Sequence, residues 1–171
     1  MAEPTAELAR ALAVAVPGRV RTNEPLARHT SFRIGGPADI LVSPDTAEEL
    51  GAMLRVAAAR GVAVTMVGGG SNMLVGDAGI RGVVVKLGRG FRRVAWEEPC
   101  VRAGAAVQLG RLAREAVDRG LAGLEYAEGI PGTVGGALFM NAGAYGGDLA
   151  ATVAAVEGLE ATGAEQTIAA A

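Results

Sequence analysis

The chain has 171 residues and a formal net charge of −2; 50% of its residues are hydrophobic, 20% are charged and 4% are aromatic. Near-neutral charge and few aromatic rings argue against a nucleic-acid partner, because proteins that bind nucleic acids neutralise phosphates with basic residues and stack bases on aromatic rings. The single cysteine, Cys100, excludes an internal disulfide. No basic N-terminal region and no long apolar stretch occurs, so we expect a cytoplasmic protein without a membrane span.

An N-terminal helix and then the order β-α-β-β-β are predicted for the first half of the chain. Apolar residues spaced four apart predict a helix over residues 5–16. The clearest helix follows "SP", with Asp45 as its N-cap, Glu48 completing a capping box and Gly61 at its left-handed C-terminal position. Strands are expected on both sides of this helix, at residues 39–42, 62–67, 73–75 and 83–87.

The second half is predicted to combine a hairpin, a helix and a glycine-rich region. The stretches "FRRVAWEE" and "CVRAGAA" are typical of paired strands, and "VQLGRLAREAVDRG" predicts an amphipathic helix that ends at Gly120. A short helix is expected after Pro131 and a strand over residues 152–161. Together these elements predict an α+β fold with mixed sheets and flanking helices rather than a regular βαβ series.

The stretch "VAVTMVGGGSNMLV" places three glycines directly after a predicted strand. It lacks the last glycine of a dinucleotide-binding G-x-G-x-x-G and the lysine of a Walker loop, and another strand is expected after it. Glycine still allows positive φ and close backbone approach, and consecutive N–H groups in such a loop can bind an anion. A tight turn without a ligand is the equal alternative for this stretch alone.

A second glycine-rich stretch, "EGIPGTVGGALFMNAGAYGG", begins about sixty residues later. Pro131 is placed to start a short helix, and Gly132, Thr133 and Val134 would then offer free N–H groups. The chain thus has two candidate phosphate-binding segments, which a ligand with a pyrophosphate bridge could occupy together.

The stretches "HTSFRIGGPAD", "VGGGSNMLVGDAGIRGVVV" and "GLAGLEYAEGIPGTVGGALFMNAGAYGG" resemble the UDP-N-acetylenolpyruvoylglucosamine reductase (UDP-N-acetylmuramate dehydrogenase) family in order and context, over roughly residues 25–160. This resemblance implies a two-lobed FAD-binding domain of the vanillyl-alcohol oxidase and p-cresol methylhydroxylase type. It would cover residues 18–171, with one lobe at 18–88 and the other at 89–171. The family's C-terminal substrate-binding domain would be absent.

The same resemblance implies non-covalent FAD and a set of residues that contact it. Residues 68–73 would surround the pyrophosphate and ribitol, and residues 129–135 would close on it from the second lobe. Asn141, Ala142 and Gly143 would line the flavin, and Tyr145 would lie near the isoalloxazine and the substrate opening, with a buried tyrosine in a turn as the alternative. The implied cofactor-binding residues are Gly68, Gly69, Gly70, Ser71, Asn72, Met73, Gly129, Ile130, Pro131, Gly132, Thr133, Val134, Gly135, Asn141, Ala142 and Gly143.

The resemblance also implies a reaction in peptidoglycan precursor synthesis, in which NADPH reduces FAD and reduced FAD reduces a UDP-linked enolpyruvyl amino sugar. The family's catalytic arginine, serine and glutamate follow the segments matched here, in Tyr-Arg-x-Ser and Gly-Ser-x-Phe motifs and near the C-terminus. This sequence contains neither motif, so we assign no catalytic residue. We expect the FAD-binding portion of an enzyme, inactive alone.

Other residues favour plainer roles, and other functions stay open. His29 is the only histidine, which argues against a histidine-based metal site, and we expect it to have a surface or loop role. Glu125 and Glu128 could be an acid pair but are more typical of a charged loop. The rival functions are another FAD-linked oxidase of the same fold, and a non-catalytic flavin-binding or nucleotide-binding module. His29 and Cys100 lie outside the glycine-rich stretches, which disfavours covalent flavin.

Overall fold

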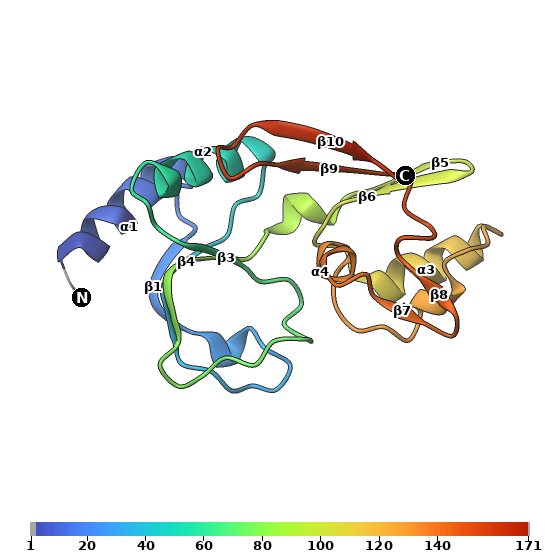
Figure 1. Ribbon diagram of the computed structural model, residues 1–171, viewed down its shortest axis with the longest axis horizontal. Helices are drawn as coiled ribbons and strands as arrows, with labels where there is room; N and C mark the ends of the chain where they lie inside the picture. The colour runs from blue at the N-terminus through green and yellow to red at the C-terminus, as the bar shows by residue number, and fades with distance from the viewer. Residues whose placement is uncertain (1–2, 171) are drawn as a thin grey trace.

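A mixed four-stranded sheet organises the first part of the chain in the computed structural model, which describes residues 3–170 (Figure 1). The strand order is β1-β2-β4-β3. β1 runs antiparallel to β2, whereas β4 lies parallel to both β2 and β3. The bounds are β1 Val20–Pro25, β2 Pro37–Val42, β3 Val64–Met66 and β4 Ile80–Val85.

Two helices cover one face of this sheet. α1 (Glu3–Ala15) and α2 (Ala47–Ala58) bury a shared core against alternate residues of β2 and β4. Alternation sends the other residues of these strands, such as Leu41 and Val84, to the opposite face. There they pack with Leu26 of the short 3-10 helix η1 (Leu26–Arg28) and with Val67 and Val75. The loops that carry these last residues therefore cover the second face of the sheet.

The second part of the chain is built from shorter elements around its own core. Its elements are η2 Arg89–Arg92, β5 Val94–Glu97, β6 Cys100–Ala103, α3 Leu109–Asp118, η3 Glu125–Ala127, α4 Val134–Phe139, β7 Gly143–Ala144 and β8 Gly147–Asp148. Leu109 and Ala113 of α3 pack on Tyr126, Ala137 and Leu149. This cluster holds α4, and with it the second glycine-rich stretch, in place.

A C-terminal hairpin returns toward the first part of the chain. β9 (Ala155–Leu159) pairs antiparallel with β10 (Glu165–Ala169), and Figure 1 shows the pair extending from the β5–β6 hairpin to α2. Its turn lies on α2, where a Cβ on Gly163 would be 2.7 Å from the carbonyl oxygen of Gly51. Arg102 of β6 pairs with Glu157 of β9 at 2.8 Å. The hairpin thus connects both parts of the molecule.

The observed elements confirm most predicted ones and correct others. The N-cap of α2 is Thr46, whose side chain accepts the N–H of Glu49, and not Asp45. The strand predicted at 73–75 is wrong: this segment is a loop, because Met73 and Val75 turn inward to the second face of the sheet without a partner strand. Within residues 3–170, none of the helices combines the length and apolar character needed to cross a bilayer.

Candidate functional site

The two glycine-rich segments, residues 68–73 and 129–136, are in direct contact. Ser71 Oγ donates a hydrogen bond to the carbonyl oxygen of Pro131 at 3.1 Å. A Cβ built on Gly69 would lie 3.0 Å from Gly132 Cα, and one on Gly132 would lie 2.8 Å from Ser71 Oγ. Side chains at these glycines would therefore force the segments apart, so the close approach depends on glycine.

The first segment presents a run of backbone N–H groups without protein acceptors. Val67 N–H completes the pairing with Val85, and from Gly68 to Met73 no backbone N–H donates to another described residue. Gly70 is nevertheless a buried residue and adopts φ +69°. Buried N–H groups almost always have a partner, and successive free ones at a left-handed turn form an anion-binding concavity. This segment is thus suited to a phosphate group.

The second segment offers fewer free groups than its sequence indicates. Val134 N–H donates to the carbonyl of Val107 at 2.9 Å, and Gly135 N–H donates to that of Ala105 at the same distance. The prediction of a free N–H at Val134 is therefore wrong, because the carbonyl of Val107, in the turn before α3, already accepts it. The N–H groups of Gly132 and Thr133 do stay without a described acceptor, on the side that meets the first segment.

A cluster of charged side chains surrounds His29, whose backbone contacts the first segment at Gly70. The carbonyl oxygen of His29 would be 2.0 Å from a Cβ on Gly70, and Ser31 N–H donates to the Gly70 carbonyl at 3.0 Å. The His29 ring lies between Glu24 Oε1, 3.0 Å from Nε2, and Lys86 Nζ, 3.3 Å from Nδ1. His29 is therefore not a plain surface or loop residue: its side chain is 13% exposed and fixes the backbone against which Gly70 packs.

Burial and neighbouring charges shift two pKa values in this cluster. The hydrogen bond from His29 is the main reason that the pKa of the Glu24 carboxyl lies below its usual range, with Arg21 and Arg28 adding to the effect. Burial lowers the pKa of the Lys86 ammonium, and the positive charge of Arg92 lowers it further. Sequence reasoning missed Lys86, although a cation at the carboxyl end of a buried parallel strand is a signal for a site.

The remaining predicted site residues divide into inward and outward groups. Met73 packs on the core behind the first segment, whereas Ile130, Val134 and Ala142 pack on the core of the second part. Asn141 binds within its own loop, because its Oδ1 accepts the N–H of Ala150 at 2.9 Å. Exposed positions are Gly69, Asn72, Gly129, Pro131, Asn141 and Gly143.

Tyr145 extends into solvent. Its side chain is 93% exposed at φ 53°, so the alternative of a buried tyrosine in a turn is wrong. Phe139, at the end of α4, is 89% exposed. The end of α4 and the loop that follows it therefore each present an exposed aromatic side chain.

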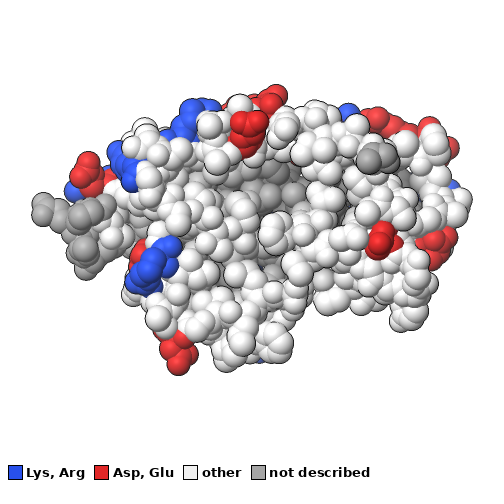
Figure 2. Space-filling view, in the orientation of Figure 1, with Lys and Arg blue, Asp and Glu red and all other residues white. Residues whose placement is uncertain are grey.

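Charged side chains lie around the edge of one face of the molecule and not at its centre (Figure 2). Figure 2 shows a face that is hollowed near its centre, with acidic and basic side chains around its edge. An uncharged centre of this kind suits a largely apolar ring system.

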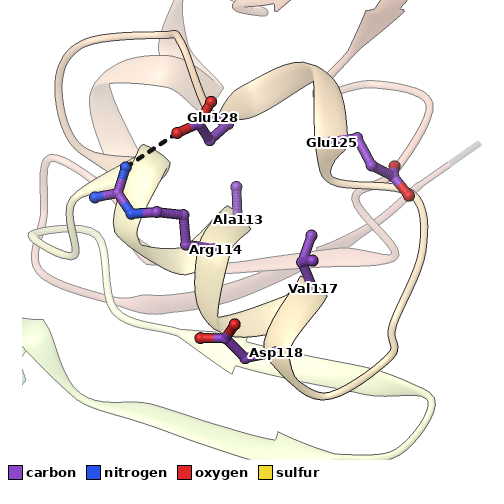
Figure 3. A pocket seen from close by; sticks show the side chains of 6 residues that line it. All are labelled: Ala113, Arg114, Val117, Asp118, Glu125 and Glu128. Carbon is purple, nitrogen blue, oxygen red and sulfur yellow. Dashed lines mark hydrogen bonds and ion pairs between the residues drawn. The ribbon is translucent and has the colours of Figure 1, made fainter.

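A separate shallow hollow of about 400 Å³ lies on α3 and η3 (Figure 3). It is lined by Ala113, Arg114, Val117, Asp118, Glu125 and Glu128. Arg114 pairs with Glu128 at 3.4 Å. Glu125 accepts the N–H of Gly123 at 2.8 Å, and hydrogen bonds from its own backbone N–H and from that of Gly123 lower the pKa of its carboxyl. Glu128 is ion-paired and the pKa of the Glu125 carboxyl is lowered, which favours a charged loop over an acid pair.

Comparison with known proteins agrees with this geometry. Residues 38–169 match the FAD binding domain family. The chain is 50% identical over 151 residues to UDP-N-acetylenolpyruvoylglucosamine reductase 2 of Symbiobacterium thermophilum, an alignment that covers 88% of this chain and 49% of the relative. The chain thus spans about half the length of this curated relative.

Solved structures give the same result for the fold. The UDP-N-acetylenolpyruvylglucosamine reductase of Thermus caldophilus superposes with a TM-score of 0.72 at 36% identity, covering 85% of this chain and 50% of that one. The 6-hydroxy-D-nicotine oxidase of Arthrobacter nicotinovorans reaches 0.70 at 21% identity, covering 90% and 36%, which supports the fold alone. The predicted α+β fold of the vanillyl-alcohol oxidase type is confirmed. The chain belongs to the FAD binding domain family, and its sequence is similar to about half the length of the UDP-N-acetylenolpyruvoylglucosamine reductases.

Proposed function

We propose that the chain binds FAD non-covalently, with the diphosphate on residues 68–73 and on Gly132 and Thr133. The observation that carries this proposal is the set of unpaired N–H groups from Gly68 to Met73, placed against a second glycine segment. Backbone donors suit phosphate oxygens, and glycine lets the backbone approach them closely. The lobe boundaries at 18–88 and 89–171 belong to the same proposal.

The contact between the two glycine segments supports this proposal. The glycine contact leaves no room for Cβ atoms where the two segments meet, so backbone atoms line this contact. In our proposal Asn141, Ala142 and Gly143 bound the flavin and Tyr145 lies at the substrate opening. When bound, FAD supplies a two-electron carrier that exchanges hydride with NADPH and with substrate. The protein supplies orientation and excludes water around it.

We further propose that this chain forms the FAD-binding portion of an NADPH-dependent cytoplasmic reductase that acts on a UDP-linked enolpyruvyl amino sugar. Support comes from the name of the Symbiobacterium relative and from the identity of 50% with it. The chain contains neither the Tyr-Arg-x-Ser nor the Gly-Ser-x-Phe motif of that family. We therefore expect no turnover of the UDP-linked substrate by these 171 residues alone.

The test is a titration of the purified, flavin-free chain with FAD. We expect one FAD per chain, quenched flavin fluorescence and a visible spectrum that persists after desalting. Gly69→Val should abolish this binding, because its Cβ would lie 3.0 Å from Gly132. Gly158→Val is the matched control, since a Cβ there meets nothing within 4 Å. A folded wild type that binds no FAD up to about 100 µM would contradict the proposal.

A covalent flavin, as in some FAD-linked oxidases, has a separate test. Both ring nitrogens of His29 already have partners, and Cys100 is exposed at the start of β6 in a hairpin. We therefore expect acid precipitation to release all flavin into the supernatant. Flavin that stays with the precipitated chain would favour the oxidase alternative.

A further inference from the structure

Lys86 is the only lysine of the chain and occupies an unusual position. It directly follows β4, and Val67 N–H donates to the carbonyl of Val85 at 2.8 Å, which places Lys86 beside the start of the first glycine segment. Its ammonium donates to His29 Nδ1 at 3.3 Å, and His29 in turn contacts Gly70 through its carbonyl oxygen. The side chain is thus part of the support beneath residues 68–73.

The charge of Lys86 has no acidic partner among residues 3–170. Glu24 lies on the far side of the His29 ring and already receives Arg21 at 3.5 Å and Arg28 at 3.9 Å. The positive charge of Arg92 of η2 acts on Lys86 and lowers its pKa, after the larger effect of burial. Arg92 forms no ion pair with another described residue either. Two cations that repel each other and have no counter-ion are costly when one is half-buried, and a bound anion would relieve that cost.

We propose that Lys86, held by His29 and assisted by Arg92, supplies the positive charge of the phosphate site, and that it recognises the diphosphate of a nucleotide cofactor. This inference rests on the proposed function for the identity of the cofactor. In this proposal the free N–H groups from Gly68 to Met73 orient the phosphate oxygens, since each hydrogen bond is directed along its N–H bond. Lys86 provides net charge, which backbone groups lack.

The experiment compares Lys86→Gln, Lys86→Arg and the wild type in binding FAD and inorganic pyrophosphate. Arg60→Gln is the matched control, because it removes one exposed cation at the far end of α2, where Arg60 contacts only its own helix. We expect Lys86→Gln to weaken FAD binding by about 10-fold to 100-fold, which is typical of a lost charged hydrogen bond. Lys86→Arg should retain most of the affinity, and Arg60→Gln should match the wild type.

Pyrophosphate separates this inference from the proposed function. We expect it to raise the melting temperature of the wild type but not that of Lys86→Gln, whether or not FAD binds. If the wild type binds FAD and Lys86→Gln binds it within twofold, the role of Lys86 is refuted and FAD binding stands. If the wild type binds no FAD, the proposed function is wrong. If pyrophosphate raises the melting temperatures of the wild type and of Lys86→Gln equally, the role of Lys86 is refuted as well. If Lys86→Gln does not fold, the wild type alone provides the test. A rise in its melting temperature with pyrophosphate that is unchanged at about 1 M salt refutes the role of Lys86, because salt screens the attraction between the ammonium and the anion.

Discussion

Replacing Gly70 by alanine tests the contact between the first glycine segment and the segment beneath it. A Cβ at this position would lie 2.0 Å from the carbonyl oxygen of His29 and 2.9 Å from Thr30 Cα, both backbone atoms. Alanine at φ +69° costs about 1 kcal/mol, and overpacking adds about 1–3 kcal/mol, giving about 2–4 kcal/mol in total. The His29 side chain is held by Glu24 and Lys86, so the backbone cannot move away freely.

Gly61→Ala is the matched control for this prediction. Gly61 has φ +62°, and a Cβ there meets nothing within 4 Å, so alanine should cost only about 1 kcal/mol. Urea unfolding followed by circular dichroism measures both free energies, and flavin fluorescence measures FAD affinity. We expect Gly70→Ala to lose more stability and to lose FAD binding, while Gly61→Ala keeps it. Equal unfolding free energies and equal FAD affinities for the two variants would refute the reasoning.

Three further predictions concern a helix cap, a buried carboxylate and the contact between the segments. Thr46→Ala should lower the free energy of unfolding by about 1 kcal/mol in a urea titration, because α2 loses its N-cap acceptor; no change would mean that the cap is not used. The pKa of Glu24 is lowered in the folded state. Its contribution to the free energy of unfolding is therefore fully present above the ordinary glutamate pKa and is lost as the pH falls through the lowered pKa of the folded state. Unfolding at acid pH should therefore depend less steeply on pH in Glu24→Gln, and an unchanged slope would contradict this. Ser71→Ala removes the hydrogen bond to Pro131 and should weaken FAD binding by less than about tenfold, with a larger loss pointing to direct contact with the ligand.

Helices and strands were predicted correctly where local apolar spacing and end residues are enough to determine them. Both long helices and the strand at 83–87 follow from apolar spacing, and Gly61 and Gly120 adopt the left-handed φ expected at helix ends. β1 and β10 were missed, because their sequences "VRTNEP" and "EQTIA" are mostly polar, and pairing with a neighbouring strand determines them. The strand predicted at 73–75 failed for the opposite reason, since its apolar side chains pack inward without a partner strand.

The site was predictable in its residue types and not in its hydrogen bonds. Glycine content alone indicated two backbone-lined segments, and their contact through Ser71 and Pro131 agrees with that reading. Which N–H groups stay free depends on distant carbonyls, such as that of Val107, whose position no local pattern encodes. The environment of Lys86 was hidden for the same reason, because His29 lies 57 positions away from it in the chain. The assignment of individual residues to FAD stays a prediction.

The hydrogen bond between Ser71 and Pro131 spans 60 positions of the chain, and this separation has a consequence during protein synthesis. A ribosome adds about 5–20 residues per second, so the second glycine segment is made about 3–12 seconds after the first. During that interval the nascent first part carries its open N–H groups without the segment that closes over them. In our proposal FAD binding therefore follows the synthesis of α4, because only then are both glycine segments present.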